Sequence, residues 1–337
     1  MSKKKILILK NDRTGDLFVS LRAINSILNK HYNDDICIFL SHINKKFAFL
    51  FPNLHKKIFS MNLNIFEKIN IFIYFLINKI DSVYVLTPKS YYYFLPLFFR
   101  NTKFFAITIK AKRNRPSKYF LPYLYKYVVL DRINLKKRDS SYNIQKRLIN
   151  IDSIREKNLI NENYNLSHHF DYPKKFVYFH YKHRLFHDLL NWELKDIKNL
   201  LAFLSTKYEN VLFSSEINNK TINDYFSNSY NTYDFNKKLH IAKNKENIHF
   251  LKDIDGYDLF DAVRNSNIII APEGIITHIG YFLKKPLFAL MHFNLKNKND
   301  FISQMISCKE WFPPNNYKFI VLKKDYHQSL KKIMKRL

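Results

Sequence analysis

Residues 6–17 of this chain read ILILKNDRTGDL: four apolar residues end in a polar loop that contains Gly15, and an amphipathic segment continues to residue 30. The apolar run has the length of a buried strand, and the apolar positions in 17–30 recur at helical spacing. Residues 268–282 repeat the pattern, with three isoleucines, a turn at Gly274 and a second helix-like segment. We therefore expect two strand–loop–helix units, one in each half of the chain.

Glycine is scarce in this sequence, with four residues in 337, whereas average usage is about 7%. A chain so depleted is expected to keep glycine where the backbone bends or approaches a ligand. Gly15 and Gly274 therefore mark two candidate phosphate or sugar sites. The alternative is that both are ordinary turn glycines.

Length and periodicity predict an α/β protein of two Rossmann-like domains with parallel sheets, since 337 residues exceed what one core usually supports. The domains are expected at 1–165 and 172–324, joined by a polar linker at about 131–171. The basic helix 325–337 is expected to pack back on the first domain.

The periodicity places the individual elements as follows. Strands are expected at 5–10, 35–40, 82–86, 176–179, 211–213, 248–250, 268–270 and 286–290. Helices are expected at 17–30, 65–79, 194–204, 257–264, 277–283 and 325–337.

The chain is strongly basic, with 56 Lys and Arg against 28 Asp and Glu and a formal net charge of +28. Such a balance suggests an anionic partner, such as nucleic acid, anionic lipid or phosphorylated glycolipid. The codon drift of an AT-rich genome explains the abundance of Lys and Asn equally well. No nucleic-acid-binding signature accompanies basic runs such as 110–115, so we expect no specific nucleic acid partner.

Cysteine usage and hydropathy exclude two further classes of protein. Cys37 and Cys308 lie far apart without a CxxC partner, so neither a disulfide framework nor a cysteine zinc site is indicated. The most apolar stretches, 69–77 and 91–99, are too short to span a bilayer. Burial is the expected fate of both, with interfacial contact as the alternative for 91–99.

In the first motif, Asp16 is expected at the carboxyl end of the first strand, where open α/β sheets bind ligands. A carboxylate there can act as a general base, while the amides of Thr14 and Gly15 hold an anionic group at the helix start. The alternative is that Asp16 caps a helix beginning at residue 17.

In the second motif, Glu273, Gly274, Thr277 and His278 stand at the start of a helix, an arrangement that suits a pyrophosphate. Thr277 and His278 are expected to donate hydrogen bonds to phosphate oxygens of a leaving nucleotide. The alternatives are that Glu273 caps the helix and that His278 is a satisfied, half-buried histidine.

Residues 6–17, with Ala23 downstream, resemble the first strand, loop and helix of glycosyltransferase family 9, the lipopolysaccharide heptosyltransferases. Residues 259–290 are similar to the nucleotide-sugar motif of that family, and Trp192 after the basic His183-Arg184 turn resembles its middle segment. The resemblance spans nearly the whole chain and is strongest at its two ends.

This resemblance implies a GT-B fold, in which two Rossmann-like domains face an interdomain cleft, and an inverting, metal-independent glycosyl transfer. It implies a nucleotide-diphosphate sugar as donor, typically ADP-heptose, and no cofactor. The implied acceptor is a lipopolysaccharide-core or other surface glycan. The implied location is cytoplasmic, with peripheral attachment to the anionic inner face of the inner membrane.

By motif position, the resemblance implies that Asp16 is the base and that the Glu273–His278 loop lines the donor. The chain departs from the family, which has Asp-Thr-Gly before the histidine and a lysine at the position of Asn191. Lys182 or Arg184 is expected to supply that cation, and Glu216 to contact the nucleotide ribose. Retaining GT-B enzymes carry a second glutamate where this chain has Tyr281, which favours the inverting reaction.

Three histidines, His180, His183 and His187, raise the hypothesis of a metal site, but no carboxylate or cysteine is evident to complete the set, so no metal is expected. Two rivals to the transferase remain. One is a basic nucleic-acid-binding protein, and the other is a non-catalytic glycosyltransferase homologue.

Overall fold

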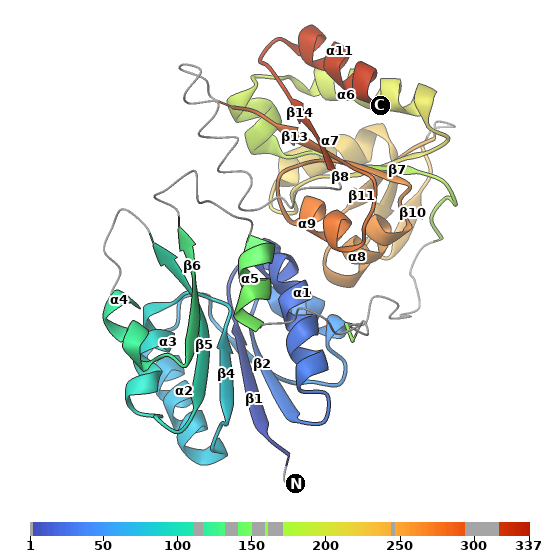
Figure 1. Ribbon diagram of the computed structural model, residues 1–337. Helices are drawn as coiled ribbons and strands as arrows, with labels where there is room; N and C mark the ends of the chain where they lie inside the picture. The colour runs from blue at the N-terminus through green and yellow to red at the C-terminus, as the bar shows by residue number, and fades with distance from the viewer. Residues whose placement is uncertain are drawn as a thin grey trace. The chain divides into compact units, whose positions relative to one another are not determined.

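The structure of the protein, a computed structural model, describes residues 3–110, 117–131, 141–149, 159–160, 171–243, 247–293 and 317–337. These residues divide into two compact units, the first holding the described residues up to 160 and the second those from 171 onward. Each unit is built on one predominantly parallel sheet with helices on both faces (Figure 1). The predicted α/β class is therefore confirmed.

The first unit contains a parallel sheet in the order β3-β2-β1-β4-β5-β6 among its described residues. Its strands are β1 (Lys5–Lys10), β2 (Asp35–Ser41), β3 (His55–Phe59), β4 (Ser82–Val85), β5 (Lys103–Lys110) and β6 (Lys126–Asp131). Its helices are α1 (Thr14–Lys30), η1 (Asn44–Leu50), α2 (Ile65–Asn78), α3 (Ser90–Phe94), η2 (Leu95–Leu97), α4 (Ser117–Phe120), η3 (Leu121–Tyr123) and α5 (Ser141–Ile149).

Strand β1 is apolar without alternation because both of its faces are covered. Leu7 and Leu9 pack in one cluster with Ile71 and Phe75 of α2. The intervening even-numbered residues are equally buried, and α1 packs beside α5 (Figure 1). The ILIL run is thus explained by burial on two sides.

The second unit contains a sheet in the order β10-β9-β11-β8-β7-β12-β13-β14, parallel except for the edge pair β10–β9. Its strands are β7 (Val177–His180), β8 (Val211–Ser214), β9 (Asn231–Asp234), β10 (Leu239–Ile241), β11 (Ile248–Lys252), β12 (Ile268–Pro272), β13 (Leu287–Met291) and β14 (Tyr317–Val321). Its helices are the π-helix η5 (Arg184–Leu189), α6 (Leu194–Lys207), α7 (Lys220–Ser229), α8 (Gly256–Asn265), α9 (Ile275–Phe282) and α11 (Tyr326–Arg336).

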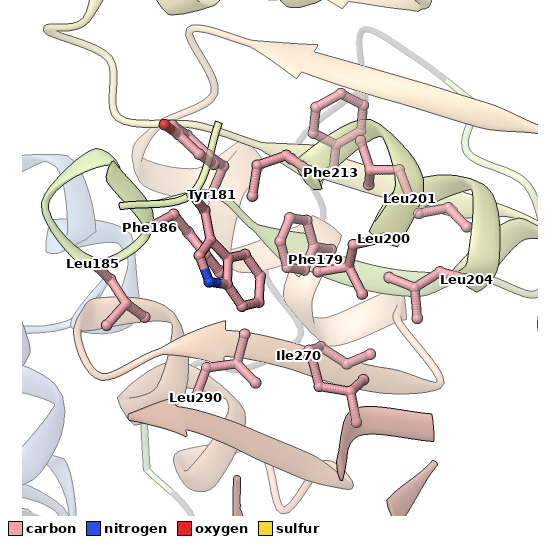
Figure 2. Packing of buried hydrophobic residues seen from close by; sticks show 14 of the residues in the cluster. Phe179, Tyr181, Leu185, Phe186, Leu200, Leu201, Leu204, Phe213, Ile270 and Leu290 are labelled. Carbon is pink, nitrogen blue, oxygen red and sulfur yellow. The ribbon is translucent and has the colours of Figure 1, made fainter. Parts of the chain in front are cut away.

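The core of the second unit is aromatic. Phe179 of β7 and Phe213 of β8 lie in one cluster with leucines of α6 (Figure 2). Phe186 of η5 and the buried Trp192 belong to the same cluster, with their ring centroids 5.4 Å apart. The segment that carries the predicted basic residues is therefore anchored in the core by its apolar neighbours.

Helix α9 lies very close to β12 because Gly280 has no side chain. A Cβ atom at this position would lie 2.4 Å from Cδ1 of Ile269, well inside van der Waals contact. Gly280 therefore permits close packing of the carboxyl-terminal part of α9 against the start of β12.

Two expected segments differ from the sequence prediction. The expected linker contains α5, whose Ile144 and Leu148 are buried at i, i+4 spacing, so part of it belongs to the first unit. The C-terminal helix α11 belongs to the second unit, whereas the sequence analysis expected it to pack on the first domain. Its Ile333 is buried in the core of the second unit, and its Tyr326 ring contacts Trp192 edge-on.

Cys308, most of the basic run 110–115 and the region 300–316 lie outside the described residues. Across the described residues, no helix combines the length and the apolar character needed to cross a membrane.

Candidate functional site

Each sheet has a point where the strand order reverses, and ligands of open α/β proteins bind there, beyond the carboxyl ends of the strands. In the first sheet this point lies between β1 and β4, since the chain continues from β1 to β2 on one side and from β4 to β5 on the other. In the second sheet it lies between β7 and β12. The predicted site residues follow β1, β7 and β12, except Glu216, which follows β8.

At the first point, a cavity of about 250 Å³ opens beside the ends of β1 and β4. Asp16 lines it, and its polar neighbours in the wall are Lys10, Asp12, Thr87, Lys89, Ser141 and Gln145. The wall also contains apolar residues of β5, β6 and α5. The cavity is thus amphipathic, with its charged groups at the end of β1, in the first turn of α1 and in the loop after β4.

Asp16 does not cap the helix, because α1 begins at Thr14 and not at residue 17. The N-cap is Arg13, which makes no side-chain capping bond. Asp16 lies in the first turn, half-buried, where the helix dipole favours negative charge. Gly15 also lies within this turn, so the predicted bend at Gly15 is wrong.

Two lysines and a carboxylate that the sequence analysis passed over surround the same cavity. Nζ of Lys10 forms an ion pair with Oδ2 of Asp12 at 2.7 Å. Nζ of Lys89 donates to the backbone oxygens of Asn11, at 2.8 Å, and Met61. Burial lowers the pKa of Lys89 to about 8, against the opposing charge of Asp12. Lys10 ends β1, Asp12 follows that strand by two residues and Lys89 follows β4 by four, and this placement near the strand ends was the available sequence signal.

At the second point, residues from several segments come together as the sequence predicted. Nζ of Lys182, two residues beyond β7, donates to the backbone oxygen of Glu273 at 3.0 Å. Oε2 of Glu216, two residues beyond β8, accepts a hydrogen bond from the backbone of His183 at 2.8 Å. Arg184 begins η5 and is exposed to solvent.

The loop into α9 is closed by its own residues. Gly274 is the N-cap, and its N–H donates to Oγ1 of Thr277 at 3.1 Å. That hydroxyl donates in turn to the backbone oxygen of Gly274 at 2.7 Å. The Thr277 hydroxyl proton is thus bound within the loop, and the expected donation to a phosphate stays a prediction.

Glu273 and His278 form the charged part of this loop. Nε2 of the buried His278 lies 3.8 Å from Oε1 of Glu273. The His278 ring, together with the charge of Lys182, holds the pKa of the Glu273 carboxyl below its usual value despite partial burial. Glu273 is not the helix cap, since Gly274 occupies that position.

Gly274 is not needed for the backbone conformation. Its φ of 160° is extended, and a Cβ atom there would meet only Nζ of Lys182, at 3.9 Å. The fold therefore accommodates a side chain at this position. Closeness to a ligand remains the functional reason to expect glycine.

The three histidines of the metal hypothesis separate. His180 ends β7 of the second sheet, and its Nδ1 lies 2.9 Å from Oγ of Ser214. Burial lowers the pKa of His180 to about 3. His183 and His187 instead lie beside Asp188. The expectation that no carboxylate completes the set is thus wrong, because the π-turn of η5 brings Asp188 to both rings.

No family model matches the sequence, and no curated relative matches it. The chain does match solved structures. The chain is similar to the glycosyl transferase family 9 structure from Veillonella parvula, with 13% identity, coverage of 99% of this chain and 90% of that one, and a TM-score of 0.62. It is similar to the E. coli ADP-heptose lps heptosyltransferase II, with 12% identity, coverage of 98% and 96%, and a TM-score of 0.64.

A third similar structure is that of an enzyme named for a different reaction. The UDP-GlcNAc 2-epimerase from Methanocaldococcus jannaschii has 15% identity, coverage of 98% of this chain and 92% of that one, and a TM-score of 0.53. At these identities the likeness shows the fold, which is the GT-B fold expected from the sequence, and the family 9 resemblance is confirmed at that level.

Proposed function

We propose that this protein is an inverting glycosyltransferase that moves a sugar from a nucleotide-diphosphate donor to a hydroxyl of a surface-glycan acceptor. One observation carries the proposal: the predicted base, Asp16, and the predicted donor loop, 273–278, each lie at the switch point of their own sheet. The likeness to glycosyltransferase structures over nearly the full length supports it.

In the proposed reaction, Asp16 takes the proton of the acceptor hydroxyl while the oxygen attacks the anomeric carbon. The bond from that carbon to the diphosphate oxygen breaks on the opposite face, so the configuration inverts. The negative charge ends on the nucleotide diphosphate. The neighbouring Asp12 forms an ion pair with Lys10 at 2.7 Å, and motif position assigns the role of base to Asp16.

The second unit stabilises the departing diphosphate. The first N–H groups of α9 have no partners within the helix and carry its positive dipole end. Lys182 gives one hydrogen bond to Glu273 and retains two further donors for phosphate oxygens. We propose that these groups, and not a metal ion, meet the developing charge.

Glu273 suits the sugar better than the diphosphate. Its lowered pKa keeps it ionised, and an ionised carboxylate only accepts hydrogen bonds. Sugar hydroxyls donate such bonds, whereas phosphate oxygens repel the charge. Glu273 therefore orients the transferred sugar, for which heptose from ADP-heptose is the first candidate, and Glu216 contacts the ribose.

The first unit offers a surface for the anionic membrane that would present a glycolipid acceptor. Helix α2 exposes a continuous apolar stripe formed by Ile65, Phe66, Ile69, Ile73, Leu76 and Ile77. Its one carboxylate, Glu67, is bound to the backbone N–H groups of Ser60 and Asn64. The exposed Lys57 and Lys79 flank the helix. An apolar stripe flanked by cations fits an anionic lipid surface.

The test of the transfer reaction is turnover with a panel of nucleotide sugars and candidate acceptors, for wild type, Asp16→Asn and Asp12→Asn. We expect Asp16→Asn to lose about 10²- to 10⁴-fold in kcat, as is usual for removal of a general base. The matched variant Asp12→Asn should lose much less. Undiminished turnover in Asp16→Asn would exclude the base assignment.

Thermal shifts with ADP, UDP, GDP and CMP identify the nucleotide independently of turnover. Nucleotide binding without turnover on any acceptor would favour the non-catalytic homologue. Salt-sensitive binding to nucleic acid without any nucleotide effect would favour the nucleic-acid-binding alternative. Sedimentation with anionic and neutral vesicles tests the α2 surface, and Phe66→Asp should abolish binding to the anionic ones.

A further inference from the structure

A cluster of three side chains, from His183 at the N-cap of η5 and from His187 and Asp188 within it, is distinct from the groups assigned to glycosyl transfer. His183, His187 and Asp188 place one ligand atom each within 4.8 Å of one another. Nδ1 of His183 lies 3.4 Å from Oδ1 of Asp188, and Nδ1 of His187 lies 3.2 Å from the same oxygen. The two imidazole rings are stacked, with centroids 4.6 Å apart.

These separations fit the edges of a metal coordination tetrahedron. Ligand bonds from zinc to nitrogen or carboxylate oxygen are about 2.0–2.1 Å long. The edge of a regular tetrahedron is about 1.6 times the centre-to-corner distance, so neighbouring zinc ligands are separated by roughly 3.3–3.4 Å. Both contacts from the imidazoles to Asp188 lie at this value within 0.2 Å.

The backbone explains how adjacent residues can converge in this way. Residues Arg184–Leu189 form a π-helix, whose i→i+5 repeat places Asp188 about one turn after His183. Such turns recur at functional sites. The apolar residues of η5, Leu185 and Phe186, are buried and hold the turn against the core.

The cluster is open to a solvent-borne ion. The side chains of His183, His187 and Asp188 are 32%, 61% and 53% exposed. Two imidazoles and one carboxylate are the ligand set of Zn²⁺, whereas Mg²⁺ and Ca²⁺ prefer oxygen ligands alone. Three protein ligands leave the fourth position for water.

We propose that His183, His187 and Asp188 bind one Zn²⁺ ion through Nδ1, Nδ1 and Oδ1, with water as the fourth ligand. The site is separate from the transfer chemistry and does not rest on it. It adjoins groups that we assign to the donor: the preceding residue, Lys182, binds the backbone oxygen of Glu273, and the backbone N–H of His183 donates to Glu216. The bound ion cross-links η5 at the end of β7.

The experiment is titration of the purified, untagged full chain with ZnCl₂ by calorimetry, and with CoCl₂ by visible absorption. Wild type should bind one ion per chain and give the intense visible bands of tetrahedral Co²⁺. His187→Ala and Asp188→Asn should each weaken Zn²⁺ binding at least about tenfold, since even outer-shell changes cost that much. The matched control is His327→Ala, an exposed histidine of α11 in the same unit.

Circular dichroism establishes that each variant is folded. Absence of binding in wild type overturns the proposal, as does equal binding in wild type and both ligand variants. Loss in only one of the two variants overturns the three-ligand assignment. Loss of binding in His327→Ala would place the ion elsewhere and overturns it as well.

Discussion

The contact between Gly280 and Ile269 predicts a strong energetic coupling between α9 and β12. A methyl group added at residue 280 would lie 2.4 Å from Cδ1 of Ile269, although carbon atoms pack best at about 3.5–4.0 Å. Ile269 is fully buried, so the overlap of more than 1 Å must be relieved inside a packed core. Overpacking of this kind costs roughly 1–3 kcal/mol.

A compensating gain makes the single variant a poor test. Alanine is about 1 kcal/mol more favourable than glycine inside a helix. Gly280→Ala should therefore lower the free energy of unfolding by only about 0–2 kcal/mol, the difference between the two effects. The steric part is isolated by a double-mutant cycle with Ile269→Val, which removes the clashing Cδ1 atom.

The cycle gives a sharp expectation. Ile269→Val alone should cost about 0.5–1.5 kcal/mol. In that background Gly280→Ala should stabilise the protein by about 1 kcal/mol, because only the helix-propensity gain remains. The coupling energy should thus be roughly 1–3 kcal/mol, equal to the relieved overlap.

Equilibrium urea unfolding measures these energies if it reports the second unit alone. The chain contains two tryptophans, Trp192 and Trp311, and Trp192 is buried in the core of the second unit. All variants are therefore made in a Trp311→Phe background and followed by tryptophan fluorescence. A coupling energy below about 0.5 kcal/mol, the usual limit of additivity, would refute the close-packing argument.

Three further predictions concern the donor loop. Gly274→Ala should leave the unfolding midpoint unchanged, since the new Cβ makes only an ordinary 3.9 Å contact with Lys182. The same substitution should weaken nucleotide binding in a thermal-shift assay, and unaltered affinity would remove the ligand-based reason for this glycine. Thr277→Val should lower the free energy of unfolding by about 1 kcal/mol because the loop loses its cap, while Thr277→Ser should retain it, and equal stability of the two variants would contradict the capping role. The pKa of Glu273 is lowered in the folded state, chiefly by His278. The stabilisation from this carboxylate is therefore present above its unfolded pKa of about 4.3 and is lost as pH falls through the lower folded pKa. Glu273→Gln should flatten the acid limb of the curve of unfolding free energy against pH, and an unchanged curve would argue against the interaction.

The sequence predicted best the elements whose signal is local. The runs at residues 6–9 and 268–270 form strands as expected, because burial on both faces leaves a continuous apolar segment. The sequence analysis missed α5, because the helical periodicity of its nine residues is weak between polar stretches. The C-terminal helix was recognised, but its partner was not, since an amphipathic pattern does not specify what it packs against.

For the candidate sites too, local sequence position identified some residues, whereas residues whose role depends on remote contacts were missed. Asp16 and the 273–278 loop were identified from their positions after apolar runs, and Lys182 as one of two substitutes for a lysine of the resembling family. The structure places them at the two switch points. Lys89 was missed because its importance depends on backbone oxygens remote in sequence. Their roles in catalysis and donor binding remain predictions.

The order of apolar and polar residues along the chain determined the α/β class, the two units and the loops that carry the charged side chains, because strand and helix periodicities are local properties. Only the tertiary structure decided which groups are neighbours. The pairing of Asp12 with Lys10, the closure of the Gly274 loop by Thr277, and the meeting of Asp188 with two imidazoles in a π-turn all depend on backbone geometry and side-chain direction. Interactions that fall off within a few ångströms are fixed by folding, and sequence spacing alone does not specify them.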